Sequence, residues 1–423
     1  MNEKLLQYIW QFQCFNLNQL QTTDGEPILI LQPGFSNSNQ GPDFKDAKIK
    51  IADTTWAGHV ELHILSSDWH AHKHSSDENY KNVILHVVWQ NNIDLQLPFP
   101  VLELHDKVPK VLLSRFDELM HATEFIPCQR TLQLVTPIIW DSWKQRMLVE
   151  RLQDKSTLVQ AYLKLNNNNW EETFWWLLAK NFGLKVNSAT FEKIARSLPV
   201  NLLAKHKNQI HQLEALLFGQ ASLLSTTFAD DYMIMLQKEY HFLQKKYQLK
   251  RIEEPVFFLR MRPSNFPTVR LAQLAMLVHN SSHLFSKIKE ADSIKTVKKL
   301  LDVTANDYWH YHYMPDEPSA YKEKNMGTQM IDNILINTII PTLFTYGLLL
   351  NEALYKDRAL QWMEQVAAEK NSITKGFEAI GVVNKNAFDS QALLQLKNNY
   401  CNKKRCLECA VGNKILRSNG VQV

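Results

Sequence analysis

Residues 39–88 read NQGPDFKDAKIKIADTTWAGHVELHILSSDWHAHKHSSDENYKNVILHVV. Apolar and polar residues alternate on both sides of a turn at Asp53, which predicts two neighbouring strands of a β-hairpin. Hairpin strands are antiparallel, so we expect Asp43, at the start of the first strand, and Glu61, late in the second, at the same end of a sheet. Two carboxylates there predict a site for a divalent metal, because Mg²⁺ prefers oxygen ligands and needs only one or two from the protein.

The same residues carry a resemblance to a known superfamily. Pro42-Asp43 and Glu61-Leu62-His63 resemble the PD-(D/E)xK signature of restriction-endonuclease-like nucleases, with His63 standing where that signature has Lys. The resemblance implies that Asp43 and Glu61 bind Mg²⁺ or Mn²⁺ and that the third residue helps to place the attacking water. A neutral imidazole can accept a proton or bind a metal, but it lacks the permanent charge of Lys.

A wider set of short motifs gives a second resemblance. The pattern GPDF, VELH, SSDW, HxHxxDxxY and VILHVV is similar to that of a bacterial family of unknown function over essentially the whole chain. This resemblance implies no activity.

Histidine is concentrated near the acidic pair, since seven of the 15 histidines lie between His59 and His105. One interpretation places His72, His74 and Asp77 in a catalytic pocket, where they would contact phosphate or a second metal. The alternative is a polar loop whose histidines form local hydrogen bonds. His86 lies within the apolar run VILHVV and is expected in the core, unless it faces Glu61.

The periodicity of apolar residues changes after Pro127. Before it, a helix and several strands indicate mixed α/β structure, including a strand over residues 95–104; after it, nearly every segment has the 3.6-residue period of a helix. We therefore predict an α+β fold with two domains, residues 1–127 and 128–423. The resemblance implies that the first is a restriction-endonuclease-like core, and the second is a large all-helical region.

Cysteines give another signal near the C-terminus. Cys401, Cys406 and Cys409 have C-x₄-C-x₂-C spacing, and Cys128 is the best candidate for a fourth ligand. Thiolates at this spacing can bind Zn²⁺ or a 4Fe–4S cluster, and some PD-(D/E)xK nucleases resemble this chain in having one distant and three C-terminal cysteines. The alternative is a set of reduced thiols in a helical hairpin. Cys14 lies between Phe12 and Phe15 on a predicted helix and is expected in the core of the protein.

Two basic elements are candidates for contact with nucleic acid. Arg260, Arg262 and Arg270 surround a predicted helix start at Pro267, where an anion would be favoured. Another basic run is Lys403-Lys404-Arg405, and residues 308–313 (YWHYHY) offer aromatic rings for base stacking. Each has a plain structural alternative, namely a fixed helix start, a solvated surface or core packing.

Composition sets broad limits. The net charge of +4 permits a nucleic-acid partner without requiring one. No signal peptide is visible, and the apolar run 334–350 is slightly short of a membrane span, so we expect a buried helix, no membrane partner and a cytoplasmic protein. Walker, GxGxxG, GxSxG and HExxH motifs are absent from the sequence.

These observations favour a metal-dependent nuclease that acts on DNA in preference to RNA, with Asp43, Glu61 and His63 as catalytic residues. One alternative is a non-catalytic scaffold that binds nucleic acid or protein through a degenerate nuclease core. The other is a metal-dependent hydrolase of another class, built on His63, His72, His74 and Asp77.

Overall fold

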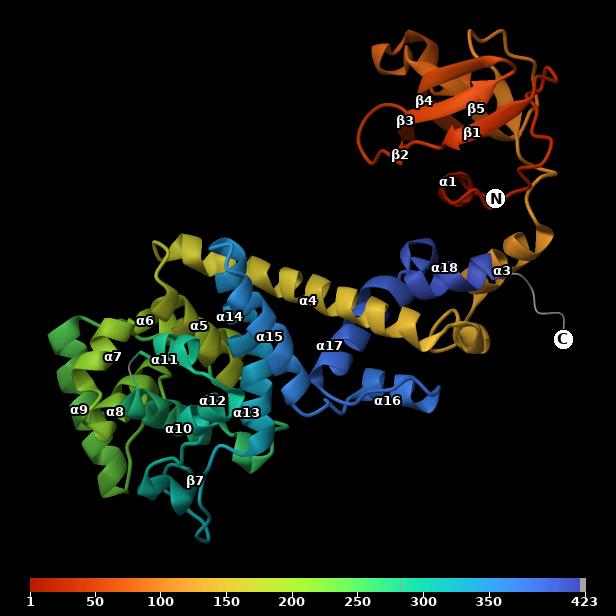
Figure 1. Cartoon of the computed structure of the whole chain (residues 1–423). Helices are drawn as coiled ribbons and strands as arrows, with labels where there is room; N and C mark the ends of the chain where they lie inside the picture. The colour runs from red at the N-terminus through yellow and green to blue at the C-terminus, as the bar shows by residue number, and fades with distance from the viewer. Residues whose placement is uncertain (282, 419–423) are drawn as a thin grey trace. The chain divides into compact units, whose positions relative to one another are not determined.

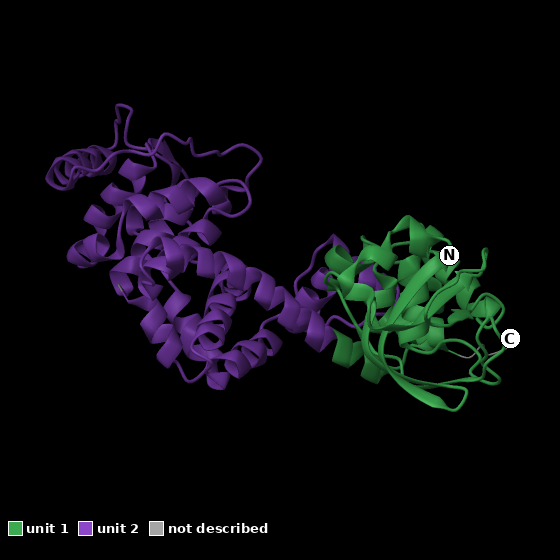
Figure 2. Ribbon diagram, turned by 90° about the horizontal axis from the view of Figure 1, so that it is seen from above, with its two compact units in different colours: residues 1–143, 396–423 green, residues 144–395 purple. Residues whose placement is uncertain are grey.

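The computed structural model describes residues 1–281 and 283–418 (Figure 1). It has an α+β fold, as predicted, with a mixed sheet near the N-terminus and a helical region after it. Contacts divide the chain into two compact units (Figure 2). Unit 1 contains residues 1–143 and the segment from residue 396 onward, and unit 2 contains residues 144–395.

Unit 1 is built around one sheet, and its elements include the strands of that sheet. The elements are α1 (Glu3–Gln11), β1 (Ile28–Gln32), β2 (Phe35–Ser36), β3 (Phe44–Ile51), β4 (Thr54–Leu65), α2 (Asp68–Ala71), η1 (His74–Ser76), η2 (Glu78–Tyr80), β5 (Val83–Gln90), β6 (Val101–Glu103), α3 (Lys110–His121), η3 (Gln129–Leu134), η7 (Leu396–Cys401), η8 (Cys406–Glu408) and α18 (Ala410–Arg417).

The sheet has the order β1-β3-β4-β5-β6, with β2 paired to β3. The predicted hairpin is present, because β3 and β4 are antiparallel around a short turn at residues 52–53. β5 then lies parallel to β4, and β6 lies parallel to β5. Gly58 permits the close approach at the start of β5, since a Cβ there would lie 2.5 Å from the Asn82 carbonyl oxygen.

Burial follows the apolar pattern of the strands. Six consecutive residues of β5, from Val83 to Val88, are buried, as predicted for a strand covered on both faces. β6 is much shorter than the strand expected over residues 95–104. Pro98 and Pro100 explain the difference, because neither has an N–H to donate to a neighbouring strand.

The chain was predicted to divide after residue 127, whereas residues 128–143 and those from 396 onward belong to unit 1. The Tyr8 hydroxyl on α1 donates to Asn413 Oδ1 on α18 over 2.8 Å. The Lys397 ammonium donates to the Phe125 carbonyl oxygen. Contacts of this kind join the late segment to the N-terminal elements.

Unit 2 is helical apart from a short hairpin. Its elements, with α4 continuing from unit 1, are α4 (Pro137–Leu165), α5 (Trp170–Phe182), α6 (Ser188–Ser197), α7 (Val200–His206), α8 (Ile210–Gln220), α9 (Asp231–Tyr247), η4 (Pro263–Asn265), α10 (Pro267–Asn280), α11 (Leu284–Glu290), α12 (Ile294–Leu301), η5 (Asp307–His310), β7 (His312–Met314), β8 (Glu317–Pro318), α13 (Thr328–Ile334), η6 (Leu335–Ile339), α14 (Ile340–Leu349), α15 (Ala353–Gln365), α16 (Ser372–Ala379) and α17 (Ala387–Gln395).

The apolar run 334–350 forms helix, as predicted, and most of its side chains are buried. Within the described part of the chain, every helix is too short or too polar to span a bilayer.

Candidate metal centre

The two predicted carboxylates meet at one end of the hairpin. Asp43 directly precedes β3, Glu61 lies in β4, and the Asp43 backbone N–H donates to Glu61 Oε2 over 3.0 Å. Asp43 in turn accepts the Leu62 backbone N–H at 3.2 Å and the Gln7 side-chain amide of α1 at 2.8 Å. The prediction that antiparallel pairing brings the carboxylates together is therefore confirmed.

Both carboxyl groups lie in a place that disfavours negative charge. Burial raises the pKa of Asp43, and the charge of Glu3 on α1 raises it further. Burial also raises the pKa of Glu61, to which the charge of Asp43 adds. A cation beside the pair would reverse this effect, because an opposite charge at close range favours the ionised carboxylate.

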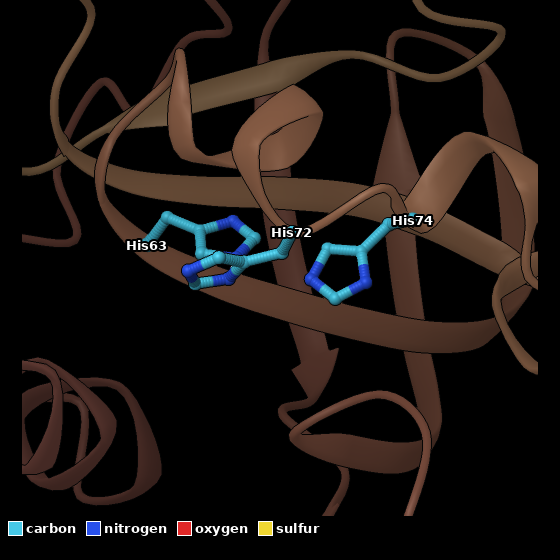
Figure 3. A group of neighbouring side chains, drawn as sticks. All are labelled: His63, His72 and His74. Atoms are coloured by element: carbon cyan, nitrogen blue, oxygen red, sulfur yellow. The ribbon is translucent and has the colours of Figure 1, made fainter.

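Histidines extend the cluster from the same strand. His63 lies two residues after Glu61, and in a strand this spacing places both side chains on one face. His63 Nε2 lies 3.1 Å from His72 Nδ1. One ring nitrogen from each of His63, His72 and His74 falls within 4.8 Å of the others, an arrangement that can hold a metal ion (Figure 3).

Glu61 connects the histidines to the carboxylate pair. Its Oε1 lies 3.4 Å from His74 Nε2 and 3.7 Å from His63 Nε2. The His74 Nε2 atom is buried and makes no hydrogen bond, although Glu61 Oε1 lies near it. Oxygen and nitrogen donors thus converge on one place, and a buried ring nitrogen without a hydrogen bond among them fits a metal ligand better than a finished hydrogen-bond network.

The innermost imidazoles are held neutral. Burial and, after it, positive charge on the neighbouring imidazoles together lower the pKa of His63 to about 2. Burial likewise lowers the pKa of His86 to about 3. Neutral imidazole is the form that binds metals. His72 is exposed, so the cluster is open to solvent on that side.

His86 is the ring behind His63, and its Nε2 lies 2.9 Å from His63 Nδ1. The parallel register pairs Glu61 with His86, which explains why a histidine from an apolar strand reaches the cluster. A metal-binding histidine usually donates its second ring N–H to a partner that fixes its orientation. His86 can accept that proton, so it lies where it can orient the His63 ring.

Aromatic rings frame the cluster, and the sequence analysis did not identify them. Tyr80 stacks on His74 with 3.9 Å between ring centroids. Trp69 is buried, packs against His74 at 5.2 Å and His86 at 5.3 Å, and donates its indole N–H to Ser75 Oγ. The SSDW and HxHxxDxxY motifs contain both rings, but their spacing alone does not indicate that residues 66–82 fold back over β4 and β5.

Asp77 has a local role in the structure. Its Oδ1 accepts the Asn79 backbone N–H at 2.9 Å and caps η2. Its charge also favours the protonated form of His74, so the two groups are near enough to interact electrostatically. Its predicted place in a catalytic pocket stays a prediction.

The four cysteines singled out in the sequence lie near one another in unit 1. Burial raises the pKa of Cys128, and the charges of Cys409 and Cys406 raise it further. Burial raises the pKa of Cys401 as well, and the other three thiols add to the effect. The segment from residue 401 and the distant Cys128 are therefore within electrostatic range of each other.

Cys14 was expected inside a helix. This prediction was wrong, since α1 ends at Gln11 and Cys14 is half-buried beyond it. The Cys14 backbone N–H donates back to the Ile9 carbonyl oxygen, which closes the chain into a turn.

The basic residues of the late segment lie beside α1. A cavity of about 350 Å³ in unit 1 is lined on its basic side by Lys4, Lys403, Lys404 and Arg405. Gln7, which donates to Asp43, lines the same cavity. Arg405 forms an ion pair with Glu408 at 2.5 Å, so its charge is partly neutralised within the protein.

Among the arginines near the predicted helix start, Arg260 and Arg262 are exposed and Arg270 is buried. α10 begins at Pro267, as predicted. Residues 308–313 lie in η5 and β7 of the same unit, and Trp309 among them is buried.

The chain combines a mixed sheet, a large helical region and a buried carboxylate–imidazole cluster. Its sequence matches the model of the family described as "Protein of unknown function (DUF2851)" over residues 3–372, and the chain belongs to this family. No curated protein and no solved structure matches the chain.

Proposed function

We propose that this protein is a divalent-metal-dependent nuclease, in which Asp43, Glu61 and His63 form the catalytic centre. The observation that carries the proposal is the position of Glu61, whose carboxylate lies beside Asp43 and within 3.4 and 3.7 Å of two imidazole nitrogens. A divalent metal there would lower the pKa of a bound water and shield negative charge on a phosphate.

The donor set bears on which metal fits. Carboxylate oxygens suit Mg²⁺ and Mn²⁺, whereas imidazole nitrogens suit transition metals such as Zn²⁺. Because His63 and His74 stand next to Glu61, the mixed set favours Mn²⁺ or Zn²⁺ over Mg²⁺. The exposed His72 marks the side from which substrate would enter.

The protonation states suggest separate roles for the chain's own residues. His63, with a pKa of about 2, is a poor proton acceptor, so its proposed role is to hold the metal while His86 fixes its ring. Glu61 has a raised pKa in the absence of a metal, and a bound cation would favour its ionised form, so its proposed role is to hold the metal beside Asp43. Asp43 is fixed by Gln7 and by the Leu62 N–H, which leaves it little freedom to move.

Strand pairing supports the same function. Asp43 directly precedes β3 and Glu61 lies in the adjacent antiparallel strand β4, so the two residues that the PD-(D/E)xK resemblance implies as metal ligands come from neighbouring strands. The basic cavity beside Gln7 would attract the phosphate backbone of a substrate strand.

The cysteines would stabilise the basic side of the same cavity. Cys406 directly follows the basic run Lys403-Lys404-Arg405, and Cys401 precedes it with one residue between them. We propose that these cysteines, with Cys409 and Cys128, bind Zn²⁺ or a 4Fe–4S cluster, which would fix the basic run beside α1. Absorbance spectra and metal analysis of anaerobically purified protein test this. The metal should be lost in Cys406→Ser and kept in Cys14→Ser; equal metal content in both variants would contradict it.

The nuclease is tested by cleavage of labelled single- and double-stranded DNA and RNA with Mg²⁺, Mn²⁺ or Zn²⁺. We expect cutting by the wild type to be lost in Glu61→Gln and strongly reduced in Asp43→Asn. His59→Gln is the matched control, because His59 lies on the same strand two residues before Glu61 but bonds to the Asp46 backbone N–H. Cleavage that survives in Glu61→Gln would refute the assignment of the site.

A second candidate function rests on the three histidines. If calorimetry shows metal binding that depends on His72 and His74 while no nucleic acid is cut, a hydrolase of another class is favoured. If the protein neither binds a metal nor cuts any substrate, the non-catalytic scaffold is favoured instead.

A further inference from the structure

Unit 2 contains a buried arginine without an acidic partner. Arg270, in the first turn of α10, is 7% exposed. Its Nη1 donates to Gln273 Oε1 at 2.8 Å and its Nη2 to Asn265 Oδ1 at 2.6 Å, while its buried Nε has no partner. Over residues 1–281 and 283–418, no carboxylate forms an ion pair with it, so two neutral amides are all that the protein offers to its charge.

The contrast with another buried cation is informative. Lys144 is 8% exposed, and its ammonium group forms an ion pair with Asp389 at 2.7 Å. A buried charge that is not paired is costly, so buried charges are normally paired. Burial lowers the pKa of Arg270 to about 10, which leaves the guanidinium charged at neutral pH. Its positive charge is therefore not neutralised by a carboxylate within the described part of the chain.

A second buried cation belongs to the same neighbourhood. Lys324 is 4% exposed, and its ammonium group donates to the carbonyl oxygens of His310 and Lys322 and lies over the face of Tyr313, 3.9 Å from the ring centroid. Its own carbonyl oxygen accepts the Gln273 side-chain amide at 3.0 Å. Gln273 thus connects the surroundings of Lys324 to Arg270.

The start of α10 adds backbone donors to these charges. Pro267 occupies the first turn, and the N-cap residue Phe266 makes no side-chain hydrogen bond to the first-turn N–H groups. Asn265, which receives the Arg270 guanidinium, directly precedes this start. Exposed Arg260 and Arg262 lie on the segment that leads into it. Uncapped N–H groups at a helix start favour an anion, and a phosphate in particular.

We propose that the start of α10, with Arg270 and Lys324, binds a phosphate group, and that this phosphate belongs to a nucleic-acid strand. The inference that this phosphate comes from nucleic acid rests on the proposed nuclease function. It is also supported by Tyr311 and Tyr321, which are 51% and 57% exposed with 5.3 Å between their ring centroids. Thr268 of α10 donates to the Tyr313 carbonyl oxygen, so the aromatic segment lies against this helix. Exposed aromatic rings beside a phosphate site suit a single strand, whose unpaired bases can stack on them.

The test is binding of a labelled single-stranded oligonucleotide to the full chain, measured by fluorescence anisotropy at several salt concentrations with EDTA present. We expect Arg270→Met to weaken binding about tenfold and to reduce the slope of log K against log salt by about 1. Exposed Arg262→Gln, which leaves the packing unchanged, should weaken binding in the same direction. Inorganic phosphate should raise the Tm of the wild type and have little effect on Arg270→Met.

Lys245→Met is the matched control, because Lys245 is an exposed cation of α9 in the same unit. Oligonucleotide binding that is equal in wild type, Arg270→Met and Arg262→Gln would overturn the proposal. A phosphate-dependent rise in Tm without any effect of these variants on the oligonucleotide would overturn the strand as the source. Because EDTA prevents metal-dependent cutting, Glu61→Gln should bind as the wild type does, which separates this inference from the nuclease proposal.

Discussion

Glu214 provides a quantitative test of how unit 2 holds its aromatic segment. This carboxyl on α8 is fully buried, and it accepts the Tyr232 hydroxyl at 2.6 Å and the Trp309 indole N–H at 3.1 Å. Burial raises the pKa of Glu214 to about 7 from an ordinary value of 4.5, although both hydrogen bonds lower it. Through Trp309, the same carboxyl anchors the residues that lead to Tyr313.

The shift of the pKa fixes the sign of the pH dependence. A carboxyl with a raised pKa in the folded state binds a proton more tightly there than in the unfolded chain. Its contribution to stability is complete below pH 4.5 and is lost as the pH rises to about 7. A difference of about 2.5 pKa units corresponds to about 3 kcal/mol of unfolding free energy.

Glu214→Gln removes this titration while keeping the size of the side chain. Relative to the wild type, the variant should therefore gain about 2.5 kcal/mol of stability as the pH rises from 5 to 8, because part of the contribution is already lost at pH 5. Urea unfolding at both pH values, followed by a signal from unit 2, measures the change. Exposed Glu253→Gln is the control, because it removes a charge without changing a buried network. Parallel pH profiles for wild type and Glu214→Gln would refute the reasoning.

Three further predictions concern packing, pairing and metal binding. Gly219→Ala should lower the Tm of unit 2, with a loss of about 1–3 kcal/mol, because the new Cβ would lie 2.1 Å from the buried ring of Tyr240; an unchanged Tm would contradict this. Lys144→Met should cost about 3–5 kcal/mol in urea unfolding, since it leaves the buried Asp389 charge unpaired, and Asp389→Asn in the same background should recover part of the loss. His86→Phe should weaken metal binding about 10- to 100-fold in calorimetry, because His63 loses the partner that orients it; equal affinity would exclude the positioning role.

The sequence alone predicted that the two carboxylates of the candidate site, Asp43 and Glu61, lie at the same end of the sheet. The alternation on both sides of Asp53 predicts an antiparallel hairpin, which brings Asp43 and Glu61 to the same end of the sheet. The register shifts between Phe44 and Ala47, and this irregularity, which the alternation does not indicate, sets Asp43 beside Glu61. The contact of His63 with His86 was not predictable in the same way. It depends on the parallel pairing of β4 with β5, which no local pattern specifies, and a histidine in an apolar run gave no sign of which face it occupies.

The positions of His72, His74 and Arg270 depend on tertiary contacts that the local sequence pattern does not specify. His72 and His74 were identified as candidates from their spacing, but the fold of residues 66–82 over the sheet depends on Trp69 packing against β4 and β5. Arg270 was identified as a basic residue of a helix start, and only the structure shows that it is buried without an acidic partner.

The division of the chain has a consequence for how the protein is made. Unit 1 takes its elements from residues 1–143 and from residue 396 onward, so all of unit 2 is synthesised between its two parts. Domains generally fold as units while the chain emerges from the ribosome. Unit 2 can therefore fold before unit 1 is complete. Cys401 and α18, which belong to the same unit as Cys128 and α1, are synthesised last. Until then the surface of α3 and η3 that α18 later covers is exposed, and apolar surface exposed in this way during synthesis favours aggregation.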